Sequence, residues 1–126
     1  MFFFVLKEYF NMLSPSHTLE LIQHVLEEMK AQNIIKIDVS QKTSIADYMF
    51  ICTGRASRHV LAIADELYSE LKKAGVSHVR LSGTESGEWA LMDCGDVIVH
   101  IMQPETRAYY NLEEIWQDSA SQSNHA

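Results

Sequence analysis

The sequence predicts a single α+β domain in which helices pack on a mixed sheet of about five strands. Three observations predict this fold class. The chain has 126 residues, which suits one hydrophobic core. Two segments have the apolar spacing of a helix face, and five short segments are apolar throughout or alternate apolar with polar residues. Helices and strands are expected in the order α-β-β-α-β-β-β-α, with no internal repeat.

The first helix is expected from about Pro15 to Gln32. Ser14 can serve as its N-cap, and Pro15 occupies the first helical position, where proline is favoured. Apolar residues then recur at the spacing of one helical face, at Ile22, Val25, Leu26 and Met29. This pattern predicts an amphipathic helix with one buried side.

Two strands are expected next. Apolar residues alternate with polar residues at Ile35, Ile37 and Val39, which predicts a half-buried strand. The following run, Tyr48 to Cys52, is apolar throughout and predicts a central strand that is covered on both faces.

A second, strongly amphipathic helix is expected after Thr53 and Gly54 end that strand. Ser57 can cap this helix, and its apolar face comprises Val60, Leu61, Ala64, Leu67, Tyr68 and Leu71. Lys72 and Lys73 favour its C-terminal end, and Gly75 stops it.

The remaining elements are short. Val79 and Leu81 predict a brief strand, and the segments from Glu88 to Asp93 and from Asp96 to Met102 predict an antiparallel hairpin. Asn111 and Glu114 resemble a capping pair that begins a last short helix.

The ends of the chain are expected to lie outside the domain. The apolar run Phe2 to Leu6 is too short for a membrane span or a signal peptide, and charged residues interrupt it. We therefore expect an N-terminal extension over 1–13, a domain over 14–118 and a disordered polar tail over 119–126.

The charge of the chain narrows the choice of partners. Its formal net charge is −7, and its ten Lys and Arg residues are scattered along the sequence. A protein that grips a nucleic-acid backbone normally shows a basic balance or a basic stripe, so little direct contact with nucleic acid is expected. An acidic surface fits a basic protein better. The two cysteines, Cys52 and Cys94, have no metal-like spacing and form no dense disulfide framework, which indicates a reducing compartment, the cytosol.

Catalytic and metal-binding motifs are weak or missing. The turn from Gly54 to His59 could hold an anion at a helix start, but most such turns are plain connectors. The six histidines form no pattern of metal ligands, and Ser57 lies in no nucleophile elbow. Asp96 is explained by the hairpin turn. No cofactor and no metal are therefore expected, and the chain is not expected to be an enzyme.

The segment from Gly87 to Trp116 is the strongest candidate for a binding surface. Strand alternation places Asp93 on the same face as Trp89 and Leu91. A hydrophobic core needs apolar residues, but it does not need this arrangement of aromatic and charged residues: Trp89, Asp93, His100, Arg107, Tyr110 and Trp116. His100 has two interpretations, a core histidine with satisfied hydrogen bonds or a residue that contacts a partner.

An ordered series of motifs now amounts to a resemblance. The series reads Thr43-Ser44-Ile45-Ala46-Asp47-Tyr48, Thr53-Gly54, Ser57-Arg58-His59-Val60, Gly87-Glu88-Trp89, Leu91-Met92-Asp93, Gly95-Asp96-Val97, Val99-His100, Arg107, Tyr110, Leu112-Glu113 and Trp116. It resembles the ribosomal silencing factor family, RsfS, also called Iojap, over about Leu19 to Asp118. One departure is Ser82-Gly83, where the family usually has Glu-Gly, so affinity here would depend more on the other positions.

The resemblance implies a translation regulator that is not an enzyme. Such a protein binds the large ribosomal subunit at that subunit's protein fourteen and blocks joining of the small subunit, which represses translation under starvation or in stationary phase. The residues expected to contact the partner are Trp89, Leu91, Asp93, His100, Arg107, Tyr110, Leu112 and Trp116. Of these, Trp116 is expected to dock the last helix on the sheet.

The family fold is also similar to the nucleotidyltransferase architecture, which offers an alternative function as a nucleotidyltransferase-like enzyme or a nucleotide-binding protein. Those enzymes hold magnesium with paired carboxylates on a strand, and they have Gly-Ser where this chain has Gly54-Arg55. No such carboxylate pair lies on an expected strand, so the architecture is expected without its metal site. An exposed apolar sheet face could also pair with a second copy, as a homodimer off the ribosome.

Overall fold

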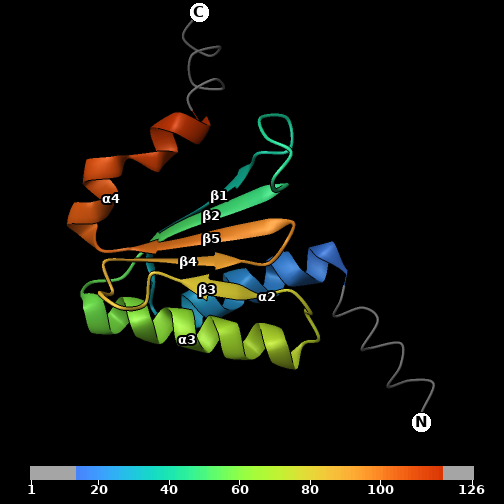
Figure 1. Cartoon of the computed structure of the whole chain (residues 1–126), viewed down its shortest axis with the longest axis horizontal. Helices are drawn as coiled ribbons and strands as arrows, with labels where there is room; N and C mark the ends of the chain where they lie inside the picture. Colours follow the sequence, from blue (N-terminus) through green and yellow to red (C-terminus); the bar gives the residue numbers. More distant parts are fainter. Residues whose placement is uncertain (1–13, 118–126) are drawn as a thin grey trace, which may run out of the picture.

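The computed structural model describes residues 14–117 as one α+β domain (Figure 1). The expected extension over 1–13 and the expected tail over 119–126 lie outside the described residues. The helices are α2 (Pro15–Glu28), α3 (Ser57–Lys73) and α4 (Pro104–Tyr110). The strands are β1 (Gln32–Asp38), β2 (Tyr48–Thr53), β3 (Arg80–Ser82), β4 (Trp89–Asp93) and β5 (Val97–Met102).

The five strands form one mixed sheet in the order β1-β2-β5-β4-β3. Only β2 and β5 run parallel, and the other neighbouring pairs are antiparallel. In the β4–β5 hairpin, Leu91 lies opposite His100 and Trp89 lies opposite Met102. The predicted fold class, the sheet of five strands and the antiparallel hairpin are confirmed.

One face of the sheet is covered by α2 and α3, which lie below it in Figure 1. Strand alternation sends one set of side chains into this layer. Its buried members include Phe50 and Cys52 from β2, Val99 and Ile101 from β5, and Ala90 and Met92 from β4. Helix α3 meets them through four residues of its predicted apolar face, Val60, Ala64, Leu67 and Leu71, and through Ile63, which was not predicted. The predicted Leu61 and Tyr68 are only half-buried.

The opposite face of the sheet has a smaller core near β1 and β2. Its buried residues are Ile37, Val39, Ala46, Met49, Ile51 and Met102, and Leu112 and Trp116 pack against them. Because β2 contributes to both cores, the prediction of a strand covered on both faces is confirmed. Trp89 of β4 and Ile98 of β5 are partly buried against the same core.

The first helix is shorter than predicted. It ends at Glu28, Met29 serves as its C-cap, and Lys30 has a φ of 63°. A left-handed residue interrupts a right-handed helix, so the apolar pattern predicted the helix face correctly but overran its end. The N-terminal prediction is confirmed, since the Ser14 hydroxyl accepts a hydrogen bond from the His17 amide at 3.3 Å.

The predicted capping role of Ser57 is wrong. Ala56 is the N-cap of α3 and makes no side-chain cap hydrogen bond, while Ser57 is the first residue of the helix. The Ser57 hydroxyl instead donates to the Ser86 carbonyl at 3.0 Å and accepts from Gln103 Nε2 at 3.0 Å. It therefore joins α3 to the β3–β4 loop and to the start of α4.

Helix α4 was not predicted as a separate element. It ends at Tyr110, and its C-cap Asn111 is left-handed with a φ of 50°. A further helical segment follows over 112–117. The predicted Asn111–Glu114 pair exists, because Asn111 Nδ2 donates to Glu114 Oε2. Asn111 thus serves both helical segments, and the prediction captured only the second.

Candidate partner-binding face

The side of β4 and β5 that points away from α2 and α3 carries five side chains that we call the open face: Trp89, Leu91, Asp93, Ile98 and His100. All are half-buried except His100, which is 9% exposed. The alternation of β4 and the register of the hairpin bring them together. The predicted grouping of Trp89, Leu91 and Asp93 is present in the structure.

Trp89 and His100 form a hydrogen-bonded pair at the centre of this face. The Trp89 indole Nε1–H donates to His100 Nδ1 at 3.0 Å, and the two ring centroids are 5.7 Å apart. An accepting Nδ1 requires the neutral imidazole with its proton on Nε2. Burial lowers the pKa of His100 to about 4, which favours the same neutral form at neutral pH. His100 therefore holds the indole in one orientation.

Tyr110 of α4 extends the aromatic surface from the sheet to the helix. Its ring centroid lies 4.9 Å from that of Trp89, and Tyr109 meets Tyr110 edge to face at 4.9 Å. Tyr110 is 50% exposed and Tyr109 is 81% exposed, although aromatic side chains of this size are usually covered. Exposed aromatic rings held in fixed geometry are typical of interface anchors.

Asp93 has a local role in addition to its place on the open face. Its Oδ1 accepts a hydrogen bond from the Gly95 amide at 2.9 Å, an interaction that stabilises the hairpin turn. Gly95 has a φ of 87°, which glycine adopts without strain. The carboxylate is consequently held at the turn end of the open face.

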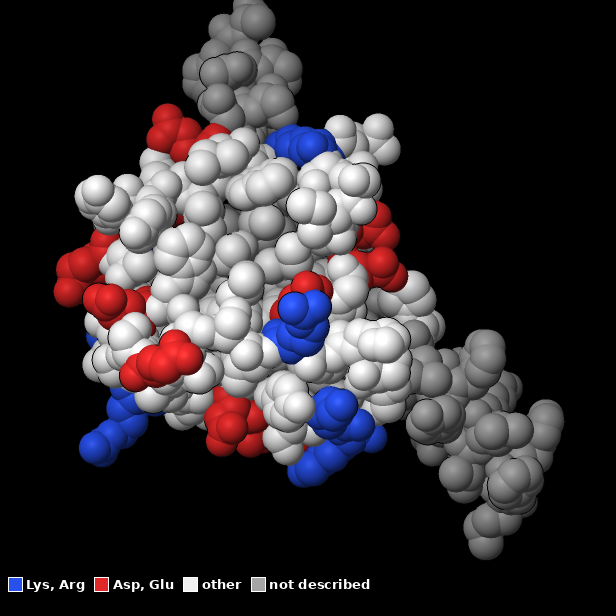
Figure 2. Space-filling view, in the orientation of Figure 1, with Lys and Arg blue, Asp and Glu red and all other residues white. Residues whose placement is uncertain are grey.

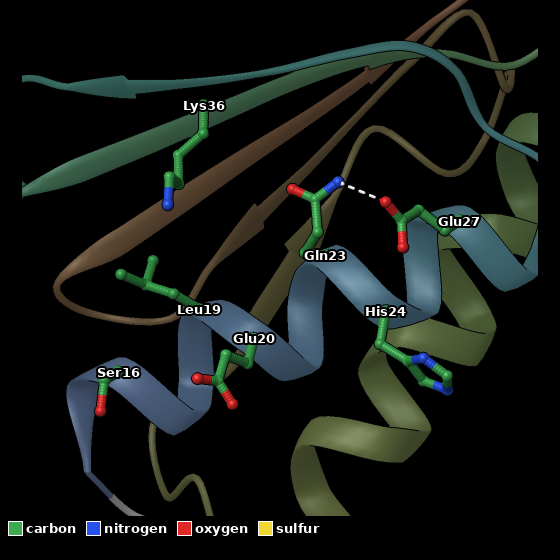
Figure 3. Close-up of a pocket in the computed structure, with 7 residues that line it drawn as sticks. All are labelled: Ser16, Leu19, Glu20, Gln23, His24, Glu27 and Lys36. Carbon is green, nitrogen blue, oxygen red and sulfur yellow. Dashed lines mark hydrogen bonds between the residues drawn. The ribbon is translucent and has the colours of Figure 1, made fainter.

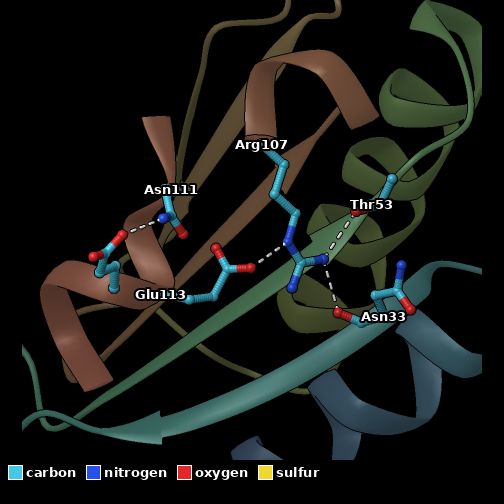
Figure 4. A network of polar contacts seen from close by, with 6 residues as sticks. Asn33, Thr53, Arg107, Asn111 and Glu113 are labelled. Carbon is cyan, nitrogen blue, oxygen red and sulfur yellow. Dashed lines mark hydrogen bonds and ion pairs between the residues drawn. The ribbon is translucent and has the colours of Figure 1, made fainter. Parts of the chain in front are cut away.

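Arg107, in contrast, is engaged inside the molecule (Figure 4). Its Nε donates to Glu113 Oε2 at 2.8 Å, and its NH1 group donates to the Asn33 carbonyl and to Thr53 Oγ1 at 2.8 and 2.9 Å. The side chain is only 11% exposed. Arg107 therefore ties α4 and the 112–117 segment to β1 and β2, which is a structural role.

Leu112 and Trp116 belong to the segment after α4 and not to the strands of the open face, although Trp89 and Ile98 contact the same second core. Leu112 and Trp116 are half-buried and pack on this core near β1 and β2. The expectation that Trp116 docks the terminal helix agrees with this position. The structure thus brings five of the eight predicted residues together, namely Trp89, Leu91, Asp93, His100 and Tyr110.

Ile98 of the open face and Tyr109 beside it were not predicted as site residues from the sequence. Ile98 shares a face with His100, and the alternation of β5 could have identified it. Tyr109 stands beside Tyr110 on α4. Recognising Pro104 as a first helical residue would have predicted that helix and its exposed side.

Residues other than Lys, Arg, Asp and Glu cover much of the surface between α4 and the loop that joins β1 to β2 (Figure 2). Acidic side chains gather beside α4, on the left of that view. An uncharged surface with an acidic margin is complementary to a partner that is itself basic around an apolar patch.

The hollow between α2 and β1 has the lining of an ordinary surface and not that of a binding site. Its volume is about 370 Å³, and Lys36 reaches toward the helix there (Figure 3). Gln23 Nε2 donates there to Glu27 at 3.0 Å. The lining mixes a lysine, carboxylates and a histidine, as on an ordinary solvated helix surface. In residues 14–117, no group of three or more His, Cys, Asp or Glu side chains could hold a metal ion.

The turn before α3 uses its polar groups internally. The Arg55 amide donates to His59 Nδ1 at 2.9 Å, and His59 Nε2 lies 2.8 Å from the Met29 carbonyl. The same imidazole therefore links this turn to the end of α2. Among the described helices, none is long and apolar enough to cross a membrane.

Comparisons with known proteins give one consistent family. The family model described as "Ribosomal silencing factor during starvation" matches residues 13–126. A ribosomal silencing factor of Chromobacterium violaceum is 44% identical over 97 residues, which cover 77% of this chain and 80% of that relative. One from Haemophilus influenzae is 43% identical over 97 residues, which cover 77% of this chain and 95% of the relative.

A solved structure shares the fold. A crystal structure of a protein from Chromobacterium violaceum superposes with a TM-score of 0.80 at 41% sequence identity, covering 82% of this chain and 87% of that one. The resemblance noted in the sequence is thereby confirmed. This chain belongs to the ribosomal silencing factor family, RsfS or Iojap, whose members are associated with the ribosome and with the regulation of translation.

Proposed function

We propose that this protein binds the large ribosomal subunit through that subunit's protein fourteen and blocks joining of the small subunit. Translation would then be repressed under starvation or in stationary phase. Family membership supports the first part of this proposal. The observation that carries it in this chain is the open face, where Trp89 is held by His100 and continued by exposed tyrosines.

The chemistry of the open face suits such a partner. Trp89 and Tyr110 offer large rigid surfaces, which contribute much of the energy in protein interfaces. Asp93 adds a carboxylate at one end, and the chain as a whole carries a net charge of −7. Protein fourteen, as a basic protein, would meet an acidic partner with favourable steering.

The proposed mechanism needs no catalysis. A domain that occupies the contact area of the small subunit acts by steric exclusion alone, so no cofactor or metal takes part. Partner contact belongs to Trp89, Leu91, Asp93, His100 and Tyr110 in this proposal, with Arg107, Leu112 and Trp116 holding the helices beside them. The protein would act in the cytoplasm, and off the ribosome the same face could pair with a second copy.

Cosedimentation tests the proposal directly. The full chain is mixed with purified large subunits, small subunits and joined ribosomes, and each mixture is separated on a sucrose gradient. We expect the chain to travel with the large subunit alone, and to reduce light scattering when the subunits are mixed under joining conditions. Binding to small subunits, or joining at an unchanged rate, would contradict the proposed mechanism.

A further inference from the structure

A cleft of about 340 Å³ lies beside the open face, between α4 and the loop that joins β3 to β4. Its aromatic wall consists of Trp89, Tyr109 and Tyr110, and its carboxylates are those of Glu88 and Glu105. Two of these five residues, Glu88 and Glu105, have no part in the proposed face. The cleft therefore differs from the open face in carrying these two carboxylates.

The aromatic wall is held in place before any ligand arrives. Trp89 is fixed by its hydrogen bond to His100 at 3.0 Å, and Tyr110 contacts the indole with ring centroids 4.9 Å apart. Tyr109 then meets Tyr110 edge to face at 4.9 Å. A cation is attracted to an aromatic face within about 6 Å of its centroid, so these rings provide a surface suited to positive charge.

Hydrogen bonds hold the backbone of the opposite wall. The Gln103 amide donates to the Glu88 carbonyl at 2.9 Å, and Gln103 Nε2 donates to the Gly87 carbonyl at 2.9 Å. A Cβ at Gly83, whose φ is 79°, would lie 2.1 Å from the Trp89 carbonyl oxygen. The loop thus approaches β4 closely, and it places Glu88 across the cleft from α4.

The two carboxylates favour a cation as the ligand. Glu88 and Glu105 are both exposed, and within residues 14–117 neither forms an ion pair or a side-chain hydrogen bond. They belong to opposite walls, one on the loop and one on the first turn of α4. Aromatic rings with flanking carboxylates attract positive charge and repel an anion.

We propose that this cleft binds an arginine side chain of a basic protein partner. A guanidinium is planar, so it can stack on an indole or a phenol ring while its N–H groups donate to a carboxylate. A lysine ammonium has no plane to stack and is more strongly hydrated. The source of the arginine rests on the proposed function, whereas the chemistry of the cleft does not.

The first experiment tests the cleft without a ribosome. N-acetyl-arginine amide is titrated into the ¹⁵N-labelled full chain, and the indole N–H signals of Trp89 and Trp116 are followed. We expect a saturable shift at Trp89 and none at Trp116, which does not line the cleft. The neutral citrulline derivative should give no shift at Trp89. An equal response to citrulline, an equal response to the lysine derivative, or none to arginine would overturn the proposal.

The second experiment uses variants in large-subunit binding. The Glu88→Gln/Glu105→Gln double variant should lower affinity at least about tenfold, in the range measured for charged contacts at interfaces. Glu85→Gln, in the same loop but outside the cleft, should bind as the unaltered chain does. Tyr109→Leu should weaken binding, and Tyr109→Phe should retain it, because only the latter keeps the aromatic face.

The two experiments separate this proposal from the proposed function. If the unaltered chain binds large subunits and all four variants bind equally well, the cleft is not the arginine site although the function stands. If the unaltered chain binds no subunit but the arginine derivative shifts Trp89, the cleft stands and the ribosomal function fails.

Discussion

The pairing of Trp89 with His100 shows how one hydrogen bond can prepare a surface for binding. An indole at a protein surface has several orientations available, and fixing one on association costs conformational entropy. Here His100 accepts the indole N–H at 3.0 Å from a nearly buried position. That entropic cost is therefore met during folding, and the ring is available to a partner in one orientation.

Trp89→Ala should weaken large-subunit binding far more than it weakens the fold. Loss of an interface anchor typically costs at least about 2 kcal/mol, roughly a thirtyfold drop in affinity. A half-buried residue on an open sheet face contributes less to the core, so the melting temperature should stay near that of the unaltered chain. Sedimentation affinity and melting curves measure the two effects. Glu66→Ala, at an exposed position of α3, serves as a control. An unfolded Trp89→Ala variant would place Trp89 in the core instead.

His100 should make the stability of the domain depend on pH. Its pKa is lowered from 6.5 to about 4 by burial, so between these values the unfolded chain binds a proton that the folded chain does not. The contribution of His100 to the free energy of unfolding is therefore fully present above pH 6.5. It is lost as the pH falls toward 4, and the loss amounts to up to about 3 kcal/mol.

Urea unfolding of the chain and of His100→Gln at several pH values measures this contribution. Glutamine cannot titrate, but it retains an acceptor for the indole N–H. The difference in unfolding free energy between the two proteins should narrow as the pH falls from about 6.5 to about 4. A difference that stays constant over this range would mean that His100 titrates normally in the fold.

At the scale of elements, Arg107 provides the polar link that holds α4 and the 112–117 segment to the sheet. Its guanidinium reaches the Asn33 carbonyl in an irregular part of β1, Thr53 at the end of β2 and Glu113 beyond α4. Glu113 Oε1 is buried and has no partner among the described residues. The arrangement depends on Arg107, because without it both oxygens of Glu113 would lack a partner.

Arg107→Met should consequently destabilise the fold by about 2 kcal/mol, since it leaves a largely buried carboxylate without its cation. The matched control is Lys73→Met, which breaks an exposed pair with Glu70 at 3.4 Å and should cost less than about 0.5 kcal/mol. Urea unfolding compares the two variants. Equal losses would show that the Arg107 network contributes no more than a surface ion pair does.

The sequence predicted the elements whose pattern is local and periodic. The apolar face of α3, the alternation of the β4–β5 hairpin and the shared face of Trp89 and Asp93 were all accessible in this way. The end of α2 was not predicted, because the pattern of apolar residues does not show that Lys30 adopts a left-handed backbone conformation. The cleft beside α4 was missed because it joins Glu88 to Glu105 through tertiary contacts, and the nucleotidyltransferase-like architecture stays a prediction.

For the molecule as a whole, both its charge and its shape favour binding of a basic protein at the open face. One face of the sheet is closed by α2 and α3, and the other carries the open face with acidic side chains near α4 (Figures 1 and 2). A net charge of −7 disfavours RNA phosphates as the direct partner and favours a basic protein. The proposed partner should therefore be captured by steering over distance and retained by the aromatic side chains at contact.

Asp93→Lys should slow association with isolated protein fourteen more than Glu66→Lys does. Both changes alter the net charge equally, but only Asp93 lies on the open face, whereas Glu66 is exposed on α3. Raising the ionic strength from about 0.1 M to about 1 M shortens the Debye length from about 10 Å to about 3 Å, so it should slow the unaltered chain and reduce the difference between the variants. Stopped-flow association rates at several salt concentrations measure this. If both variants slow association equally, net charge rather than the open face steers the encounter; if neither does, a basic partner at this face is excluded.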